Sequence, residues 1–157
     1  MITASIIPGQ GDKSLAFAIR QKVFVEEQGF CQQTEFDEVD DTALHAVVCD
    51  DGQPAATARL YQKDGTFHIG RVAVLPAFRR RGMGEVAMRL LMLKARELGA
   101  SEVALGAQVQ AQGFYEKLGF LSTGDLYDDE GVPHVRMVAA LVQQACSCCG
   151  GRCAGDR

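Results

Sequence analysis

Residues 67–98 read FHIGRVAVLPAFRRRGMGEVAMRLLMLKAREL, and the rest of the chain can be arranged around them. The first part is apolar and rich in β-branched residues, which predicts a strand over 67–74. Pro76 ends that strand, because its ring fixes φ and its nitrogen has no hydrogen to donate. Apolar residues then recur every three or four positions, which predicts a helix over 82–98 that ends at Gly99.

Three arginines and two glycines join the predicted strand to the predicted helix in the run Arg79-Arg80-Arg81-Gly82-Met83-Gly84. The first turn of a helix has unpaired N–H groups and the positive end of the helix dipole, which together attract phosphate. Glycine lets a ligand approach the backbone, and arginine adds forked donors. The run predicts either a phosphate site or a basic surface turn before an ordinary helix. Its spacing fits neither the Rossmann fingerprint nor the P-loop.

The remaining periodicities predict one α/β domain with strands and helices mixed along the chain. We expect helices over 13–28 and 110–118, and further strands over 44–49, 55–61, 103–108, 120–123 and 132–141. Turns at Asp51-Gly52 and Asp64-Gly65 join the first three strands into an antiparallel meander. The long helical connection from 74 to 103 makes the strands at its two ends parallel. The prediction is a single central mixed sheet of about six to seven strands with flanking helices.

Length and composition place the chain among ordinary globular proteins. It has 157 residues, 47% of them hydrophobic, and a formal net charge of −4. A protein that binds duplex nucleic acid is usually basic, so we expect no nucleic-acid partner. No signal peptide is evident at the N-terminus, and no apolar run approaches the length of a membrane span. The expected location is therefore the cytoplasm, with no membrane partner.

Four of the six cysteines crowd the C-terminus between Cys146 and Cys153. A disulfide framework is not expected in a reducing cytosol. Because the spacing is not a clean pair of Cys-x-x-Cys motifs, the cluster is either a Cys- and Gly-rich tail without a ligand or a soft-metal site. We place the domain at residues 1–142 and the tail at 143–157, and we predict that the function requires no metal.

The run that begins at Arg79 resembles the acetyl-CoA pyrophosphate loop of the GNAT N-acetyltransferase superfamily. The pattern of that loop is Gln/Arg-x-x-Gly-x-Gly/Ala, and Arg79, Gly82 and Gly84 occupy its three specified positions. Residues 112–120 look like the segment that flanks the thiol end of the cofactor. Five further segments of the chain resemble the ElaA/YjcF-like branch of this superfamily. They are Val23-Phe24-Val25-Glu26-Glu27-Gln28, Asp40-Asp41 with His45, Gly70-Arg71-Val72, Gly106-Ala107-Gln108 and Asp129-Glu130-Gly131-Val132-Pro133-His134. The resemblance covers most of residues 14–138.

The resemblance implies a GNAT fold in which the parallel strands splay apart and acetyl-CoA lies between them. It puts the backbone N–H of Val72 at the acetyl carbonyl, where a fixed donor stabilises the charge that develops during attack. It puts Val74 on the pantetheine arm and the arginine–glycine run around the pyrophosphate. The cofactor-binding residues that we expect are Val72, Ala73, Val74, Arg79, Arg80, Arg81, Gly82, Met83, Gly84, Glu85, Gln108, Phe114, Tyr115 and Lys117.

Acetyl transfer to an amine needs a proton acceptor for the attacking ammonium and a proton donor for the departing thiolate. The resemblance makes Tyr115 the expected general acid, although its ring could instead pack in the core. The base is left open among Glu26, Glu27, His45 and His134, and a chain of waters could replace all four. Either histidine could instead be structural, with His45 a core residue satisfied by a nearby carboxylate.

Charged residues near the expected acceptor site allow two interpretations. The acidic residues between 29 and 43 form either a solvated loop or a negative wall for a cationic acceptor. Arg59 and Arg71 either bind an anionic acceptor or pair with this acidic segment.

The function that we predict is an acetyl-CoA-dependent N-acetyltransferase. Acetyl-CoA is the co-substrate, and the acceptor is a primary amine of a small molecule or peptide. One alternative is a non-catalytic acyl-CoA-binding sensor that keeps the fold. Another is an interaction protein that acts through the cysteine tail. Dimers are common in the superfamily, so a homodimer is a further expectation.

Overall fold

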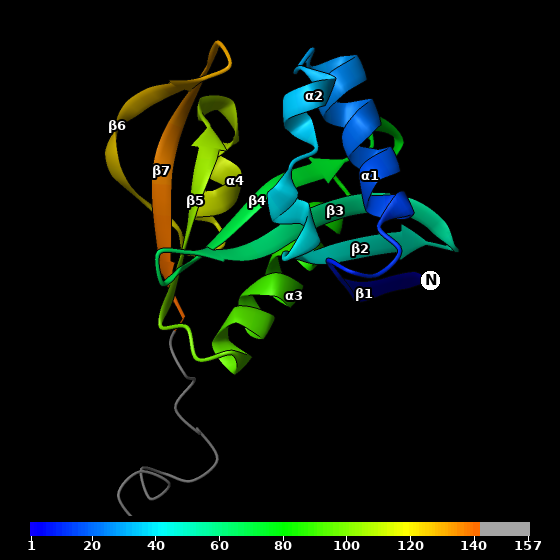
Figure 1. Ribbon diagram of the computed structural model, residues 1–157, viewed down its shortest axis with the longest axis horizontal. Helices are drawn as coiled ribbons and strands as arrows, with labels where there is room; N and C mark the ends of the chain where they lie inside the picture. Colours follow the sequence, from blue (N-terminus) through cyan, green and yellow to red (C-terminus); the bar gives the residue numbers. More distant parts are fainter. Residues whose placement is uncertain (142–157) are drawn as a thin grey trace, which may run out of the picture.

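The computed structural model describes residues 1–141, which form one seven-stranded mixed sheet (Figure 1). The strands follow the order β1-β2-β3-β4-β5-β7-β6. Their bounds are β1 (Ile2–Pro8), β2 (Leu44–Asp50), β3 (Gln53–Lys63), β4 (Thr66–Val74), β5 (Glu102–Gln108), β6 (Leu121–Asp129) and β7 (Val132–Ala140). Only β4 and β5 pair in parallel, and every other neighbouring pair is antiparallel. The predicted mixed sheet with a meander first and a parallel pair later is confirmed.

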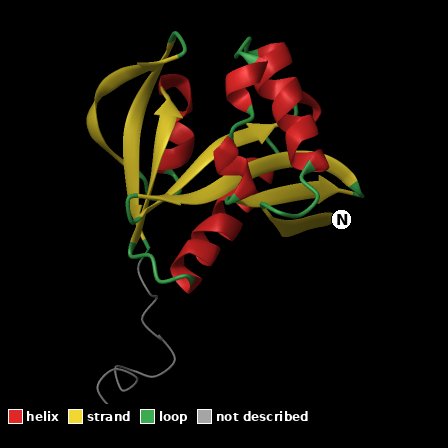
Figure 2. Cartoon of the chain, in the orientation of Figure 1, coloured by secondary structure: helices red, strands yellow, loops and turns green. Residues whose placement is uncertain are grey.

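Helices cover both faces of the β2–β4 half of the sheet. Figure 2 shows α1 and α2 on one side of these strands and α3 on the other. The helical segments are α1 (Ser14–Arg20), η1 (Gln21–Glu27), α2 (Gln32–Glu35), η2 (Glu38–Asp41), η3 (Pro76–Phe78), α3 (Met83–Glu97), η4 (Val109–Ala111) and α4 (Gln112–Glu116). The predicted helix over 13–28 is present, but its second half, η1, winds as a π-helix.

Strands β4 and β5 diverge soon after they begin. Their register contains only the pairs Phe67–Val103 and His68–Ala104. Further along β4, the register with β3 shifts between Thr57 and Arg59, and Arg71 has a φ of 51°. This bulge bends β4 away from β5. The splayed parallel pair implied by the sequence resemblance is therefore present in the fold.

Helix α3 supplies one face of the main core. Its buried side chains recur at helical spacing and pack against β3 and β4; they are Met83, Ala87, Met88, Leu91 and Ala95. A smaller cluster on the opposite face joins Ile19, Val23 and Phe24 to Ala73 of β4. Because β4 contributes to both clusters, the bulged strand is fixed from both sides of the sheet.

Three segments differ from the sequence prediction. The N-terminal strand β1 was not predicted, and β6 extends beyond the predicted 120–123 to Asp129. Segment 29–43 is not a solvated loop: it folds into α2 and η2, and it buries Glu35 and Asp40. The predicted cysteine tail lies outside the described residues. No helix within residues 1–141 is long and apolar enough to cross a membrane.

Candidate functional site

A cavity of about 910 Å³ opens where β4 and β5 diverge. Its walls come from η1, β4, the turn that precedes α3, the N-terminus of α3, β5, α4 and the hairpin of β6 and β7. The cavity is large enough to bury most of a cofactor arm and part of a second ligand. Elements that are far apart in the sequence meet here because the sheet is open between its two parallel strands.

The predicted cofactor residues line this cavity, with one exception. The exception is Arg81, whose guanidinium pairs with Asp50 and lies over the ring of Phe78 at 5.6 Å. The structure therefore brings the other predicted residues together, and their role in cofactor binding stays a prediction.

The N-terminus of α3 presents free backbone donors to the cavity. Gly82 caps the helix with a φ of 80°, a left-handed conformation that favours glycine. The N–H of Val86 donates to the carbonyl of Gly82 and is the first donor within the helix. The N–H groups of residues 83–85 come before it and therefore have no carbonyl of this helix to bond. Together with the helix dipole, these groups form a site suited to an anion such as a pyrophosphate.

Gly84 keeps the wall between α3 and α4 open. A Cβ at this position would lie 3.2 Å from a methyl carbon of Val74 and 3.3 Å from the Phe114 ring. Both contacts are tighter than ordinary van der Waals packing, so a larger residue would push into the cavity lining. The free N–H groups, the adjacent arginines and this small residue together suit an anionic group such as a pyrophosphate.

Arg79 is held by two other cavity residues. Its Nε donates to the carbonyl of Val74 at 3.0 Å, and its two terminal nitrogens donate to both carboxylate oxygens of Glu27 at 2.6 and 2.8 Å. The hydrogen bonds from Arg79 lower the pKa of Glu27. Glu27 thus lines the cavity as predicted, but its carboxylate is engaged by an arginine.

Tyr115 is a buried wall residue. Its side chain is 8% exposed, and its ring meets Phe114 and Phe120 edge-on at 5.0 and 6.0 Å. Burial raises its pKa, which keeps the phenol protonated near neutral pH. The structure shows the aromatic packing that the sequence allowed and also places the ring on the cavity wall, and the role of Tyr115 as general acid stays a prediction.

The other predicted base candidates lie in different surroundings. Glu26 is exposed and outside the cavity lining. His45 is fully buried on β2, away from the cavity lining, and its Nε2 lies 3.0 Å from the backbone carbonyl of Asp40. His134 lines the cavity, with Nδ1 2.8 Å from the carbonyl of Val132 and its ring stacked on Tyr127. The structure therefore brings only His134 and Glu27 of these four to the cavity.

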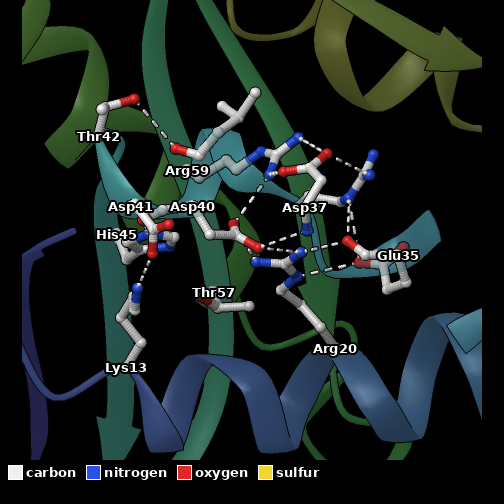
Figure 3. Close-up of polar contacts among 12 residues, drawn as sticks. Lys13, Arg20, Glu35, Asp37, Asp40, Asp41, Thr42, His45, Thr57 and Arg59 are labelled. Atoms are coloured by element: carbon white, nitrogen blue, oxygen red, sulfur yellow. Dashed lines mark hydrogen bonds and ion pairs between the residues drawn. The ribbon is translucent and has the colours of Figure 1, made fainter. Parts of the chain in front are cut away.

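Three arginines and three carboxylates form a largely buried ion network at the cavity, part of which is drawn in Figure 3. Arg20 bonds Glu35 at 3.0 Å and Asp40 at 2.7 Å, and Arg59 bonds Asp40 at 2.8 Å and Asp37 at 2.7 Å. Arg71 completes it through ion pairs to Glu35 at 3.1 Å and Asp37 at 3.3 Å. Of the two interpretations open from the sequence, Arg59 and Arg71 pair with the acidic segment.

The network shifts the pKa values of its carboxyl groups in opposite directions. Burial opposes ionisation of Asp40, but the hydrogen bonds from Arg20 and Arg59 outweigh it and lower its pKa. For Glu35 burial is the larger effect and raises the pKa, although three arginines act against it. Glu35 also lines the cavity, and sequence analysis missed it because nothing local distinguishes it from the neighbouring acidic residues.

Hydrogen bonds join side chains of distant segments at the cavity. Thr34 donates to Glu130 of the β6–β7 hairpin at 2.7 Å, and Gln108 donates to Gln28 at 2.8 Å. Tyr61 and Tyr127 also line the cavity. The lining therefore includes aromatic and hydrogen-bonding side chains as well as arginines. In residues 1–141, no group of three or more metal-ligating side chains is placed to hold an ion.

Comparison with known proteins finds one family by sequence. Residues 18–141 match the family described as "Acetyltransferase (GNAT) domain". The Bacillus subtilis (strain 168) protein named "Uncharacterized N-acetyltransferase YjcF" is 37% identical over 124 residues, which are 78% of this chain and 89% of that protein.

Two solved structures share the fold along nearly their whole length. An acyl-CoA N-acyltransferase from Pseudomonas aeruginosa aligns with a TM-score of 0.77 and 29% identity, covering 89% of this chain and 100% of that one. Escherichia coli ElaA aligns with a TM-score of 0.76 and 30% identity, covering 88% of this chain and 99% of that one.

Proposed function

Because the chain belongs to the GNAT acetyltransferase family, in its ElaA/YjcF-like branch, we propose that it transfers an acetyl group from acetyl-CoA to a primary amine of a small molecule or peptide. The observation that carries this proposal is the helix N-terminus at Gly82, which opens with its arginines onto a cavity between two splayed strands. A thioester cofactor with a pyrophosphate and a long arm matches that combination of an anion site and a narrow groove.

The arginine–glycine turn binds the pyrophosphate in this proposal. The free N–H groups at the start of α3 donate to the phosphate oxygens, and Arg79 and Arg80 add charge. Val74 and Phe114, which meet beside Gly84, line the path of the pantetheine arm. The thioester then lies near the bulge of β4, where acetyl-CoA supplies its acetyl group.

Two further residues serve the chemistry in this proposal. The N–H of Val72 stabilises the developing charge on the acetyl oxygen, because Arg71 and Val72 have no partner in the register between β3 and β4. Tyr115 donates a proton to the departing sulfur. A buried phenol with a raised pKa is suited to that role, because it is still protonated at neutral pH. It can therefore give its proton to the sulfur when the negative charge of the thiolate develops.

Calorimetric titration tests the cofactor half of the proposal. We expect acetyl-CoA, CoA and 3′-dephospho-CoA to bind in the micromolar range or tighter, with adenosine alone binding far more weakly because it lacks the pyrophosphate. Full-length protein that is folded by circular dichroism and binds none of these compounds would contradict the proposal. Calorimetry avoids the background that six cysteines would give in a thiol-release assay.

Mass spectrometry tests the transfer half. The acceptor panel contains propylamine, diaminobutane, phenylethylamine and a lysyl peptide, and the expected product carries one acetyl group on nitrogen. Binding of acetyl-CoA without acetylation of any amine would instead identify the protein as an acyl-CoA-binding sensor. The calorimetric titration and the acceptor panel together therefore separate the enzyme from the non-catalytic alternative.

A further inference from the structure

Glu35 is a carboxylate that the fold buries at the wall of the cavity. Its side chain is 4% exposed, yet the residue lines the cavity at the end of α2. Arg20 and Arg71 fix its position, because both also donate to its backbone carbonyl, at 2.6 and 3.2 Å. A charged group is rarely placed this deep unless its environment compensates it.

Only one oxygen of this carboxylate is used by the network. The hydrogen bond from Arg20 and the ion pair with Arg71 both involve Oε2. Among residues 1–141, no side chain or backbone group donates a hydrogen bond to Oε1. The network therefore holds the carboxylate in a fixed orientation while leaving one acceptor atom available.

Glu35 also lies close to the expected reaction centre. Arg71, which contacts its carboxylate and its carbonyl, is the residue directly before Val72 in the bulge of β4. Its neighbour Thr34 bonds Glu130 on the far side of the cavity. Glu35 thus contacts the strand that would hold the acetyl group, and its neighbour Thr34 reaches the β6–β7 hairpin that also lines the cavity.

We propose that Glu35 binds the ammonium group of the acceptor through Oε1 and takes its first proton. The assignment rests on the proposed acetyl transfer and adds the residue that starts it. Arg71 has two opposing effects: its positive charge favours loss of a proton from the ammonium, and the same charge disfavours protonation of Glu35. Burial favours the transfer, since it favours the protonated carboxyl that results.

The protons balance in this scheme. The ammonium gives one proton to Glu35, which later releases it to solvent, and the neutral nitrogen forms a bond to the acetyl carbon. As the C–S bond breaks, Tyr115 donates its proton to sulfur. The nitrogen then loses a second proton, which returns to the Tyr115 oxygen. The products are an N-acetyl amide, CoA with a free thiol, and one proton in solution.

Several charged groups face Glu35 and set the pH at which it ionises. They are Arg20 from α1, Arg59 from β3 and Arg71 from β4, together with Asp37 and Asp40, which bond the same guanidinium groups, and Glu130, which bonds Thr34. The three arginines offset the three network carboxylates in formal charge. Protonation of Glu35 therefore leaves one uncompensated positive charge, which favours return of the proton to solvent after each turnover.

His134 is the rival proton acceptor at this end of the cavity. Its Nδ1 must carry hydrogen to donate to the carbonyl of Val132, so the free ring nitrogen is Nε2. A test of Glu35 must therefore include a His134 variant. It must also separate proton transfer from the structural role of the ion network.

The experiment compares Glu35→Gln with Asp37→Asn and His134→Gln in the full-length protein. Asp37 belongs to the same network but does not line the cavity, so Asp37→Asn removes a similar charge without changing a lining residue. Acetyl-CoA affinity, thermal unfolding and kcat/KM against pH are measured for each, using the panel amine that wild-type protein acetylates fastest. We expect Glu35→Gln to lose about a hundredfold or more in kcat/KM with acetyl-CoA affinity unchanged.

The pH profile decides between the roles. For Glu35→Gln, kcat/KM should keep rising with pH as free amine accumulates, whereas the wild-type and Asp37→Asn profiles should share a plateau. Equal losses in Glu35→Gln and Asp37→Asn, or a profile altered only by His134→Gln, would overturn the assignment.

If Glu35→Gln does not fold, Glu35→Asp replaces it: partial activity with the wild-type profile supports the assignment, and full activity contradicts it. Absence of acetyl-CoA binding or of any transfer by wild-type protein would instead overturn the proposed function, and this assignment with it.

Discussion

Arg79 donates a hydrogen bond from each terminal nitrogen to Glu27, one to each carboxylate oxygen, at 2.8 and 2.6 Å. The two residues lie 52 positions apart, on the turn before α3 and at the end of η1. The first arginine of the arginine–glycine turn therefore already has an anionic partner. In the proposed complex, Glu27 and the pyrophosphate compete for the same guanidinium.

This competition predicts that Glu27→Gln binds acetyl-CoA more tightly. Removing the carboxylate frees Arg79 and removes repulsion of the phosphates. Because a partly exposed ion pair contributes about 0.2–1 kcal/mol, the expected gain is about 1.4- to 5-fold in Kd. Calorimetry measures it, and Glu97→Gln, which removes the same charge at the other end of α3, should bind as wild type. Weaker binding by Glu27→Gln would show that Glu27 instead positions Arg79 for the ligand.

Gly82 gives a second prediction about the cofactor site. A Cβ at this position meets no atom within 4 Å, so a side chain would extend into open space at the start of α3. Any non-glycine residue there also carries the strain of a φ of 80°. We expect Gly82→Glu to weaken acetyl-CoA binding at least about tenfold more than Gly82→Gln, because the two differ mainly in charge beside the pyrophosphate. Similar affinities for both variants, measured by calorimetry, would contradict a phosphate site at this turn.

Tyr115→Phe tests the proposed proton donor. The substitution keeps the ring that packs against Phe114 and Phe120 and removes only the hydroxyl. We expect kcat to fall by about a hundredfold while the Kd for acetyl-CoA and the unfolding temperature stay close to wild type. Steady-state kinetics by mass spectrometry measure the change. An unchanged kcat would leave Tyr115 with packing as its only role.

The sequence predicted the parts of the fold that local pattern determines. Strand β4, helix α3 and the glycine-containing turns carry strong periodic or conformational signals, and they lie close to where we expected them. Strand β1 was missed because it is an edge strand whose side chains are mostly exposed, so it has no alternating apolar face. The π-helix η1 was also not distinguished from an α-helix, because the sequence pattern used to predict helices assumes 3.6 residues per turn.

The sequence predicted cavity residues where a continuous motif or the family resemblance marked them. The arginine–glycine turn could be read from its spacing, and almost all of its residues line the cavity. Glu35 could not be found in this way, because its burial depends on two distant arginines. Arg20 lies 15 positions before it in the chain, and Arg71 lies 36 positions after it. The sequence also could not show that Arg79 is paired with Glu27, since neither residue is near the other along the chain.

The buried ion network predicts a large difference between two adjacent aspartates. Asp40 is 2% exposed and accepts hydrogen bonds from Arg20 and Arg59, whereas Asp41 is mostly exposed and pairs with Lys13. We expect Asp40→Asn to lower the free energy of unfolding by about 3 kcal/mol, near the low end for a broken buried pair because each arginine keeps another carboxylate. Asp41→Asn should cost less than about 1 kcal/mol. Equal losses in urea unfolding would show that the network adds no stability beyond a surface pair.

His45 makes stability depend on pH. Burial lowers its pKa below the ordinary 6.5, and its Nε2 donates to the carbonyl of Asp40, which leaves it neutral in the folded protein. The unfolded chain therefore takes up a proton near pH 6.5 that the folded chain resists. This contribution to stability is complete above that pH and is lost as the pH falls through the lower folded-state pKa.

The prediction is that the urea midpoint decreases as the pH is lowered below about 6.5, and that His45→Gln reduces this decrease. Glutamine keeps a donor for the Asp40 carbonyl but does not titrate. Part of the decrease should remain, because burial also lowers the pKa of His68. A double variant with His68→Gln should then reduce it further. If His45→Gln unfolds with the same pH dependence as wild type, the buried imidazole does not resist protonation as its surroundings imply.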